Sequence, residues 1–262
     1  GLDAATQPTP TISTTQCYPG KPNYGTAQTK ITYNINAGVG YTSGHQTYEY
    51  SFDGNNWTTV SQTIGNVTVT LNNPTNTSAT LTVSCPSSSS DYNYSGTIYV
   101  RAQINGVYGD TVSARYMLDN EHPHVDVAQT WTYTNKSVER NADGLATKIV
   151  LGIQFNWALL LPTYKKLTIT EANGIKSIQL SYRSGAWSQT LTDANNFSES
   201  NYYLIESILG GAALTIVIED YAGNVRTSTV NILRTGDSSP FRTPDGFRIY
   251  TAEAKPSFVD RL

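Results

Sequence analysis

Two ten-residue stretches, about 130 residues apart, share one pattern: "YEYSFDGNNW" ends at Trp57, and "IQLSYRSGAW" ends at Trp187. In each, a Ser precedes an aromatic residue, a polar turn that contains Gly, and a Trp six residues after the Ser. Gly and Asn tolerate positive φ, so the pattern predicts two strands joined by a tight turn. A hairpin that recurs at this distance indicates a repeated β domain of about 117 to 130 residues.

Short runs of alternating apolar and polar residues precede and follow both hairpins in the sequence. Turn-forming clusters such as "NNPTNTS" and "PSSSSDYNYSG" separate them. This arrangement predicts an all-β chain of the β-sandwich type. The segment "YYLIESILGG" fits either a strand or one helical turn ended by Gly210. The expected strands cover residues 31–35, 48–52, 57–60, 67–71, 79–85, 98–104, 111–117, 125–134, 148–160, 167–171, 175–182, 187–191, 214–219 and 225–233.

Composition supports strands and excludes two classes of partner. Only 14% of the residues are charged and 11% are aromatic, while Leu, Ala, Glu and Lys are too sparse for a helical protein. The net charge of −3 offers no basic surface, so we expect no nucleic-acid partner. No run of 18 apolar residues occurs, so we expect no membrane-spanning segment. The richest apolar stretch, residues 148–162, alternates as a half-buried strand does.

The two cysteines, Cys17 and Cys85, permit one disulfide bond. Cys85 closes an alternating run with Ala79, Leu81 and Val83, so its side chain is expected to point inward. A disulfide between the two would indicate an exported protein in an oxidising compartment. The alternative is two separate buried thiols.

Three stretches in which Asp precedes Pro, "LDAATQP", "LDNEHP" and "TGDSSP", mark the start, the middle and the end of the repeated region. Pro removes a backbone donor and stiffens the entry to the next strand. We therefore expect one domain over residues 1–120, a second over 121–235, and a C-terminal tail or partner-binding extension over 236–262. In each domain the hairpin Trp is expected to pack at the edge of the core, with a sugar-stacking platform as the alternative.

These residues resemble the Ig-like repeat domains of bacterial cell-surface and extracellular proteins of the adhesin type. Those repeats carry a hairpin of the form Tyr-Ser-x-Asp-Gly-x-x-Trp, here "YSFDGNNW" and, more distantly, "LSYRSGAW". They also carry an Asp-Ala-Gly-Asn turn before the last strand, here within "EDYAGNVRTSTVNI". The resemblance covers roughly residues 10–235 and implies two tandem Ig-like β-sandwiches. Its motifs specify a scaffold and carry no catalytic residue.

Sequence motifs for catalysis are missing. The chain has no P-loop, no GxSxG, no HExxH and no Cys-x-x-Cys. We therefore expect no enzyme, no catalytic residue and no cofactor. The weak metal candidates are Asp119, Asn120 and Glu121 in the linker, which offer oxygen ligands for Ca²⁺. Asp220 or Asp110, in the turns before the last strands, is the further candidate for the same ion.

The leading hypothesis is a non-enzymatic structural or adhesion module of a bacterial surface or fibre protein, located outside the cell. Its expected partners are a cell-surface or extracellular protein or glycan. One alternative is a carbohydrate-binding accessory region of a secreted enzyme or adhesin, with Tyr92 and Tyr94 as weak ligand-binding candidates. The other alternative is a surface-layer or filament subunit that self-associates through its C-terminal tail, where "FRIYT" offers a strand.

Overall fold

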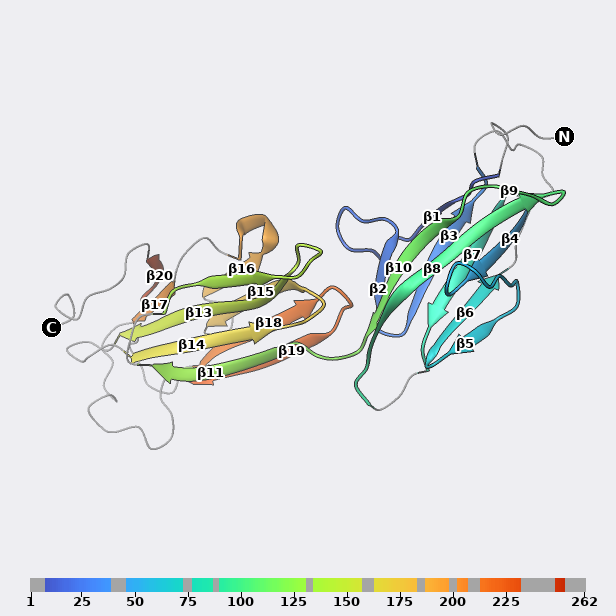
Figure 1. Ribbon diagram of the computed structural model, residues 1–262. Coiled ribbons are helices and arrows are strands. Elements are labelled where there is room, and N and C mark those ends of the chain that lie inside the picture. Colours follow the sequence, from blue (N-terminus) through green and yellow to red (C-terminus); the bar gives the residue numbers. More distant parts are fainter. Residues whose placement is uncertain are drawn as a thin grey trace. The chain divides into compact units, whose positions relative to one another are not determined.

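The computed structural model describes residues 8–38, 46–72, 77–86, 90–130, 134–156, 163–182, 187–197, 202–206, 213–231 and 248–252. Their secondary structure is almost entirely β, as the alternating pattern predicts, and the expected all-β sandwich class is confirmed. The chain divides into two compact units, Gly1–Glu121 and His122–Leu262 (Figure 1). Whether the units fold independently, with the boundaries expected from the sequence, stays a prediction.

Unit 1 is a sandwich of two sheets, and alternate residues of both sheets meet in one core. The first sheet has the order β1 (Thr11–Ser13), β3 (Lys30–Asn36), β7 (Ser78–Ser84), β6 (Val67–Asn72) and β5 (Gln62–Ile64). The second has the order β2 (Tyr24–Ala27), β10 (Val112–Asp119), β8 (Asn93–Ile104) and β4 (Thr47–Ser51), with β9 (Val107–Tyr108) paired to β8. Pairing is antiparallel except between β2 and β10.

Tyrosine side chains are prominent in the core of unit 1. Tyr33 projects from β3 and donates a hydrogen bond to the carbonyl of Arg115 on β10, in the opposite sheet. Tyr50 projects from β4 and donates to the carbonyl of Val60, 2.5 Å away, in the segment that leads to β5. These hydroxyls satisfy backbone carbonyls across the sandwich, so they align the two sheets as well as filling the space between them.

The first hairpin forms as the sequence predicts, because Tyr50 and Thr58 exchange backbone hydrogen bonds of 3.0 Å. The Asp53 carboxylate accepts hydrogen bonds from the amides of Asn55 and Asn56, each 2.8 Å, and Gly54 adopts a φ of +80°. Trp57 does not pack at the edge of the core as expected. It is half-buried and lies outside the buried cluster that forms the core.

Unit 2 is also a sandwich of two sheets (Figure 1). One sheet has the order β11 (His124–Thr130), β14 (Thr163–Thr170), β13 (Ala146–Asn156), β17 (Tyr202–Glu206) and β20 (Arg248–Ala252), with β12 (Ser137–Arg140) paired to β13. The other has the order β16 (Trp187–Thr192), β15 (Ile175–Tyr182), β18 (Ala213–Asp220) and β19 (Val225–Asn231). A short 3₁₀ turn covers Asp193–Asn195.

The described core of unit 2 is aliphatic apart from Phe197. Ile149, Leu151 and Ile153 of β13 are fully buried, which confirms the half-buried strand expected there as far as Asn156. Residues 157–160 of that expected strand lie outside the described ranges. The second hairpin joins β15 to β16, with Tyr182 opposite Trp187. The side chain of Trp187 lies outside the described residues, so its packing stays a prediction.

The C-terminal segment contributes a strand to unit 2. Within "FRIYT", residues 248–251 belong to β20, which pairs antiparallel with β17 of the same chain. The strand offered by the sequence is therefore present, but its partner is its own unit rather than a neighbouring chain. The rest of residues 236–262 lies outside the described ranges.

The predicted disulfide between Cys17 and Cys85 is wrong, because both thiols are free. Cys17 forms a bridge with Gly25 of β2, which belongs to the second sheet. Cys85 follows β7 of the first sheet, where its thiol lies 3.9 Å from the carbonyl of Thr29. Cys85 is buried in the core of unit 1, so the inward orientation expected for this residue is correct, and the burial raises the pKa of its thiol. The alternative of two separate buried thiols is correct for Cys85, whereas the separate thiol of Cys17 is only half-buried. The extracellular location loses the support of a disulfide.

No helix within the described ranges has both the length and the apolar character needed to cross a membrane.

Candidate functional site

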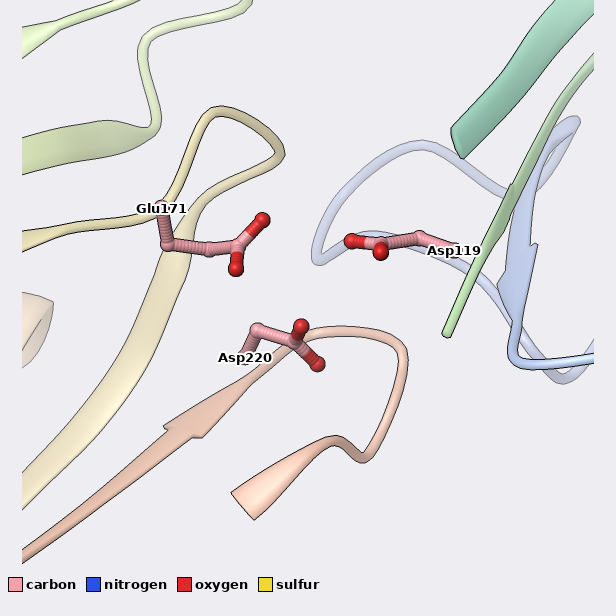
Figure 2. Close-up of side chains that lie close together, drawn as sticks. All are labelled: Asp119, Glu171 and Asp220. Atoms are coloured by element: carbon pink, nitrogen blue, oxygen red, sulfur yellow. The ribbon is translucent and has the colours of Figure 1, made fainter. Parts of the chain in front are cut away.

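Two buried carboxylates lie close together in unit 2 (Figure 2). Glu171 directly follows β14, and Asp220 is the last residue of β18. Each precedes a tight turn in which a Gly takes positive φ, namely Gly174 at +107° and Gly223 at +93°. Their ligand oxygens lie within 4.8 Å of one another. The turns that follow β14 and β18, which belong to opposite sheets, therefore bring their first residues together at one end of this sandwich.

Each carboxylate also caps its own turn. Asp220 accepts hydrogen bonds from the amides of Ala222 and Asn224, at 3.0 and 2.8 Å, and from the Asn224 side chain at 2.9 Å. Glu171 accepts a bond of 3.2 Å from the amide of Asn173. These bonds account for part of the hydrogen-bonding capacity of the two groups, since an ionised carboxylate offers about four acceptor sites.

Two carboxylates buried side by side repel one another unless a proton or a cation lies between them. Carboxylate and amide oxygens are the ligands that Ca²⁺ prefers, and the ion takes about six to eight of them. Glu171 and Asp220 have the ligand type for a hard divalent cation, although two side chains do not complete its coordination. The sequence named Asp220 for such a site. The sequence interpretation does not include Glu171. The pattern that would identify this residue is an acidic side chain between a strand and the Asn-Gly turn in "EANG".

The linker candidates Asp119, Asn120 and Glu121 have structural partners within unit 1. Asp119, which Figure 2 also labels, ends β10, is buried, and accepts a hydrogen bond of 2.8 Å from the amide of Glu121. The Asn120 side chain accepts from the amide of Tyr92 and donates to the carbonyl of Ser90, at 2.6 and 3.2 Å. Their role as Ca²⁺ ligands stays a prediction.

Asp110 has a different position from Asp119. It precedes β10, whereas Asp119 ends the same strand, so the two lie at opposite ends of an eight-residue strand. The amide of Asp110 donates to the Thr9 hydroxyl, 2.9 Å away. Asp110 and Asp119 therefore cannot ligate one ion, because eight strand residues span roughly 25 Å.

The ligand-binding candidates Tyr92 and Tyr94 stack on one another, with ring centroids 5.3 Å apart and an interplanar angle of 10°. Tyr92 is buried, and its hydroxyl donates to the carbonyl of Gln28 at 2.7 Å. The hydroxyl of Tyr94 accepts a bond of 2.6 Å from the Asn66 side chain. Tyr92 thus acts as a core residue, while Tyr94 keeps a partly exposed ring. Ligand binding by this pair stays a prediction.

A second aromatic group lies on the outer face of the sheet that contains β4 and β8. The guanidinium of Arg101 lies between the rings of Trp57 and Tyr108, at 4.3 and 3.9 Å from their centroids. It also pairs with Glu49, 3.1 Å away on β4. One face of the Trp57 ring therefore covers a cation instead of the core. This contact is absent from the sequence pattern because Arg101 lies 44 residues after Trp57.

Neither a scan against protein-family models nor a search of curated proteins found a match for this chain.

Proposed function

We propose that this chain is a non-enzymatic extracellular module of a bacterial surface or fibre protein, in which two tandem Ig-like units project or bind through loops and strand edges. The observation that carries the proposal is the use of charged side chains as structural partners. Asp53 caps a hairpin turn, and Glu49 pairs with Arg101. Asp193 forms a two-pronged pair with Arg140, at 2.7 and 3.0 Å. Charges engaged in this way support a scaffold rather than a reaction centre.

The edge of the first sheet in unit 1 is the most suitable strand edge for a protein partner. All three residues of β5 are exposed. Ile64 is 57% exposed, and Val60, just before the strand, is 63% exposed. An exposed edge with apolar side chains favours the addition of a strand from another chain.

Labelling of intact cells tests the location and the scaffold role together. Antibodies against the purified chain should label intact cells of the native organism as strongly as permeabilised ones. The purified chain should leave a panel of polysaccharide, peptide and ester substrates unchanged. Labelling that requires permeabilisation would contradict the extracellular location, and hydrolysis of any substrate would contradict the scaffold role.

A self-assembling subunit is the second candidate, in which β20 would leave its own unit and pair with β17 of a second copy. Five residue pairs join these strands at the edge of a sheet. The same ladder would form if β20 came from a second copy of the chain. Light scattering of the full chain and of a variant that lacks residues 236–262 tests this candidate. Association that requires those residues would support it, and two identical monomeric profiles would contradict it.

A further inference from the structure

A polar groove crosses the outer face of the first sheet of unit 1. Its volume is about 450 Å³, within the range of sites for small ligands. The lining comes from β1, β3, β6 and β7, four strands that lie side by side. The groove is lined by Ser13, Asn34, Ile35, Asn36, Asn72, Ser78, Ala79 and Thr80.

The strand register aligns these side chains in rows. Ser13 pairs with Asn34, Asn34 pairs with Thr80, and Thr80 pairs with Asn72. One row therefore spans four strands, or roughly 14 Å at the usual strand spacing. Asn36 and its partner Ser78 form part of a second row, two residues along the same strands. Residues two apart face the same side, so both rows present their side chains to one surface.

The composition of the groove limits the class of ligand. None of its lining residues is ionisable, so it offers no charged partner for a phosphate, a carboxylate or a metal ion. Ile35 and Ala79 are buried in the core and add no exposed apolar side chain, which excludes a lipid or an aromatic ligand. What remains is a set of amides and hydroxyls, and each of these groups can both donate and accept hydrogen bonds.

Three of the lining residues keep hydrogen-bonding capacity that no described residue uses. Asn34 and Asn36 are exposed, and in the described part of the chain the side chains of Asn34, Asn36 and Thr80 form no hydrogen bond. Asn72 makes one long contact, 3.5 Å to the Thr82 hydroxyl. Neighbouring hydroxyls of a sugar need partners that donate and accept side by side, and the amide group of Asn provides both in one plane.

We propose that this groove binds a neutral oligosaccharide lying across β1, β3, β7 and β6, with Asn34 and Asn36 as its main hydrogen-bonding residues. The site lies on a sheet face, apart from the loops and strand edges of the proposed function, and does not depend on them. Binding through neutral hydrogen bonds should be weak, insensitive to salt and independent of divalent cations.

A glycan array followed by titration calorimetry tests the proposal with the full chain. We expect neutral oligosaccharides to bind, with an affinity that is unchanged between low salt and about 0.5 M NaCl and after addition of EDTA. The double variant Asn34→Ala/Asn36→Ala should weaken binding at least ten-fold. The matched control is Asn23→Ala/Asn93→Ala, which removes two exposed amides outside the groove and should bind as the wild type does.

Melting curves of the two double variants show whether either loses its fold. Single variants Asn72→Ala and Thr80→Ala provide a second measure, since each should weaken binding less than the double variant. Three results would overturn the proposal: no binding of any neutral glycan, binding only of charged glycans, or unchanged affinity in a folded Asn34→Ala/Asn36→Ala variant.

Discussion

The two sandwiches achieve the same architecture with different cores. Unit 1 buries Tyr33, Tyr48 and Tyr50 between its sheets, whereas the described core of unit 2 consists of Ile, Leu, Val and Ala with one Phe. A tyrosine fills as much space as a large apolar residue, but its hydroxyl needs a partner when it is buried. Tyr33 and Tyr50 meet this need through backbone carbonyls, as at Arg115, whereas the described residues offer no partner to the Tyr48 hydroxyl. The sheets of unit 1 are thus held by directional bonds as well as by packing, whereas the described core of unit 2 relies on packing.

Removal of a buried leucine from each core is expected to give the largest effect. Leu81 in unit 1 and Leu180 in unit 2 are fully buried, so Leu81→Ala and Leu180→Ala should each lower the free energy of unfolding by about 2–5 kcal/mol. Denaturant unfolding followed by hydrogen exchange should show that each change affects its own unit. The exposed Val60→Ala is the control. Equal loss of protection in both units after one change would contradict independent cores.

The second-largest effect is expected in alkali, where the two units should differ in stability. Burial raises the pKa of Tyr33, Tyr48 and Tyr116 in unit 1, and of Tyr221 in unit 2. A tyrosine whose pKa is higher in the folded than in the unfolded state stabilises the fold while its hydroxyl is neutral. This contribution is fully present below about pH 10, the pKa in the unfolded state, and is lost as the pH rises through the folded pKa. Unit 1 should therefore unfold before unit 2 in alkali. Hydrogen exchange or near-ultraviolet circular dichroism measures this, and earlier loss of unit 2 would contradict the comparison.

Two tyrosine-to-phenylalanine variants sharpen the role of the hydroxyl. Tyr33→Phe should cost about 0.5–1.5 kcal/mol, because it removes a hydrogen bond and leaves the Arg115 carbonyl without this donor. Tyr48→Phe should be neutral or stabilising, since the buried Tyr48 hydroxyl has no hydrogen-bond partner among the residues that the structure describes. Urea unfolding of both variants decides the point. Equal costs would show that the hydroxyls do not act through their bonds.

The smallest expected effect lies in the hairpins. Hydrogen bonds from Asn56 and Asn55 hold the pKa of the exposed Asp53 carboxyl well below its usual range. A carboxyl whose pKa is lower in the folded than in the unfolded state stabilises the fold at pH values above its unfolded pKa of about 4. This contribution is lost as the pH falls below that value toward the folded pKa. Between pH 5 and pH 2, unit 1 of the wild type should therefore lose slightly more free energy of unfolding than unit 1 of the Asp53→Asn variant. The second hairpin has Arg183 at the equivalent position, so unit 2 should lack this acid dependence. Identical acid profiles of wild type and variant would contradict the capping role.

Alternation predicted most strands of both units because each apolar face meets the core. The strand expected at Ile175–Tyr182 is confirmed with the same bounds, and "YYLIESILGG" contains a strand, β17. Strand β2 was missed because it is short and its partner β10 follows about 90 residues later in parallel. Residues 57–60 were expected as a strand but form a single bridge at Thr58. Long-range pairing of this kind leaves no local signal.

The candidate sites were less predictable than the strands. Asp220 was named because it lies in a turn before a strand, and the turn forms as expected. Glu171 and the groove at Asn34 depend on which strands become neighbours, and that is decided by the topology rather than by local sequence. The Cys17–Cys85 pairing failed for the same reason, since the two residues belong to segments that pair with different sheets.

The parallel pairing of β2 with β10 determines how unit 1 responds to mechanical load. Tension that enters through the start of β2 and leaves through the end of β10 pulls the two strands along their axes in opposite directions. The ladder from Arg115–Tyr24 to Leu118–Ala27 is then loaded in shear, so its hydrogen bonds share the force instead of opening one after another. Resistance of this kind is set by the rate of unfolding under load rather than by equilibrium stability. A module with this ladder can therefore stay folded under a pull that would open a strand pair from one end.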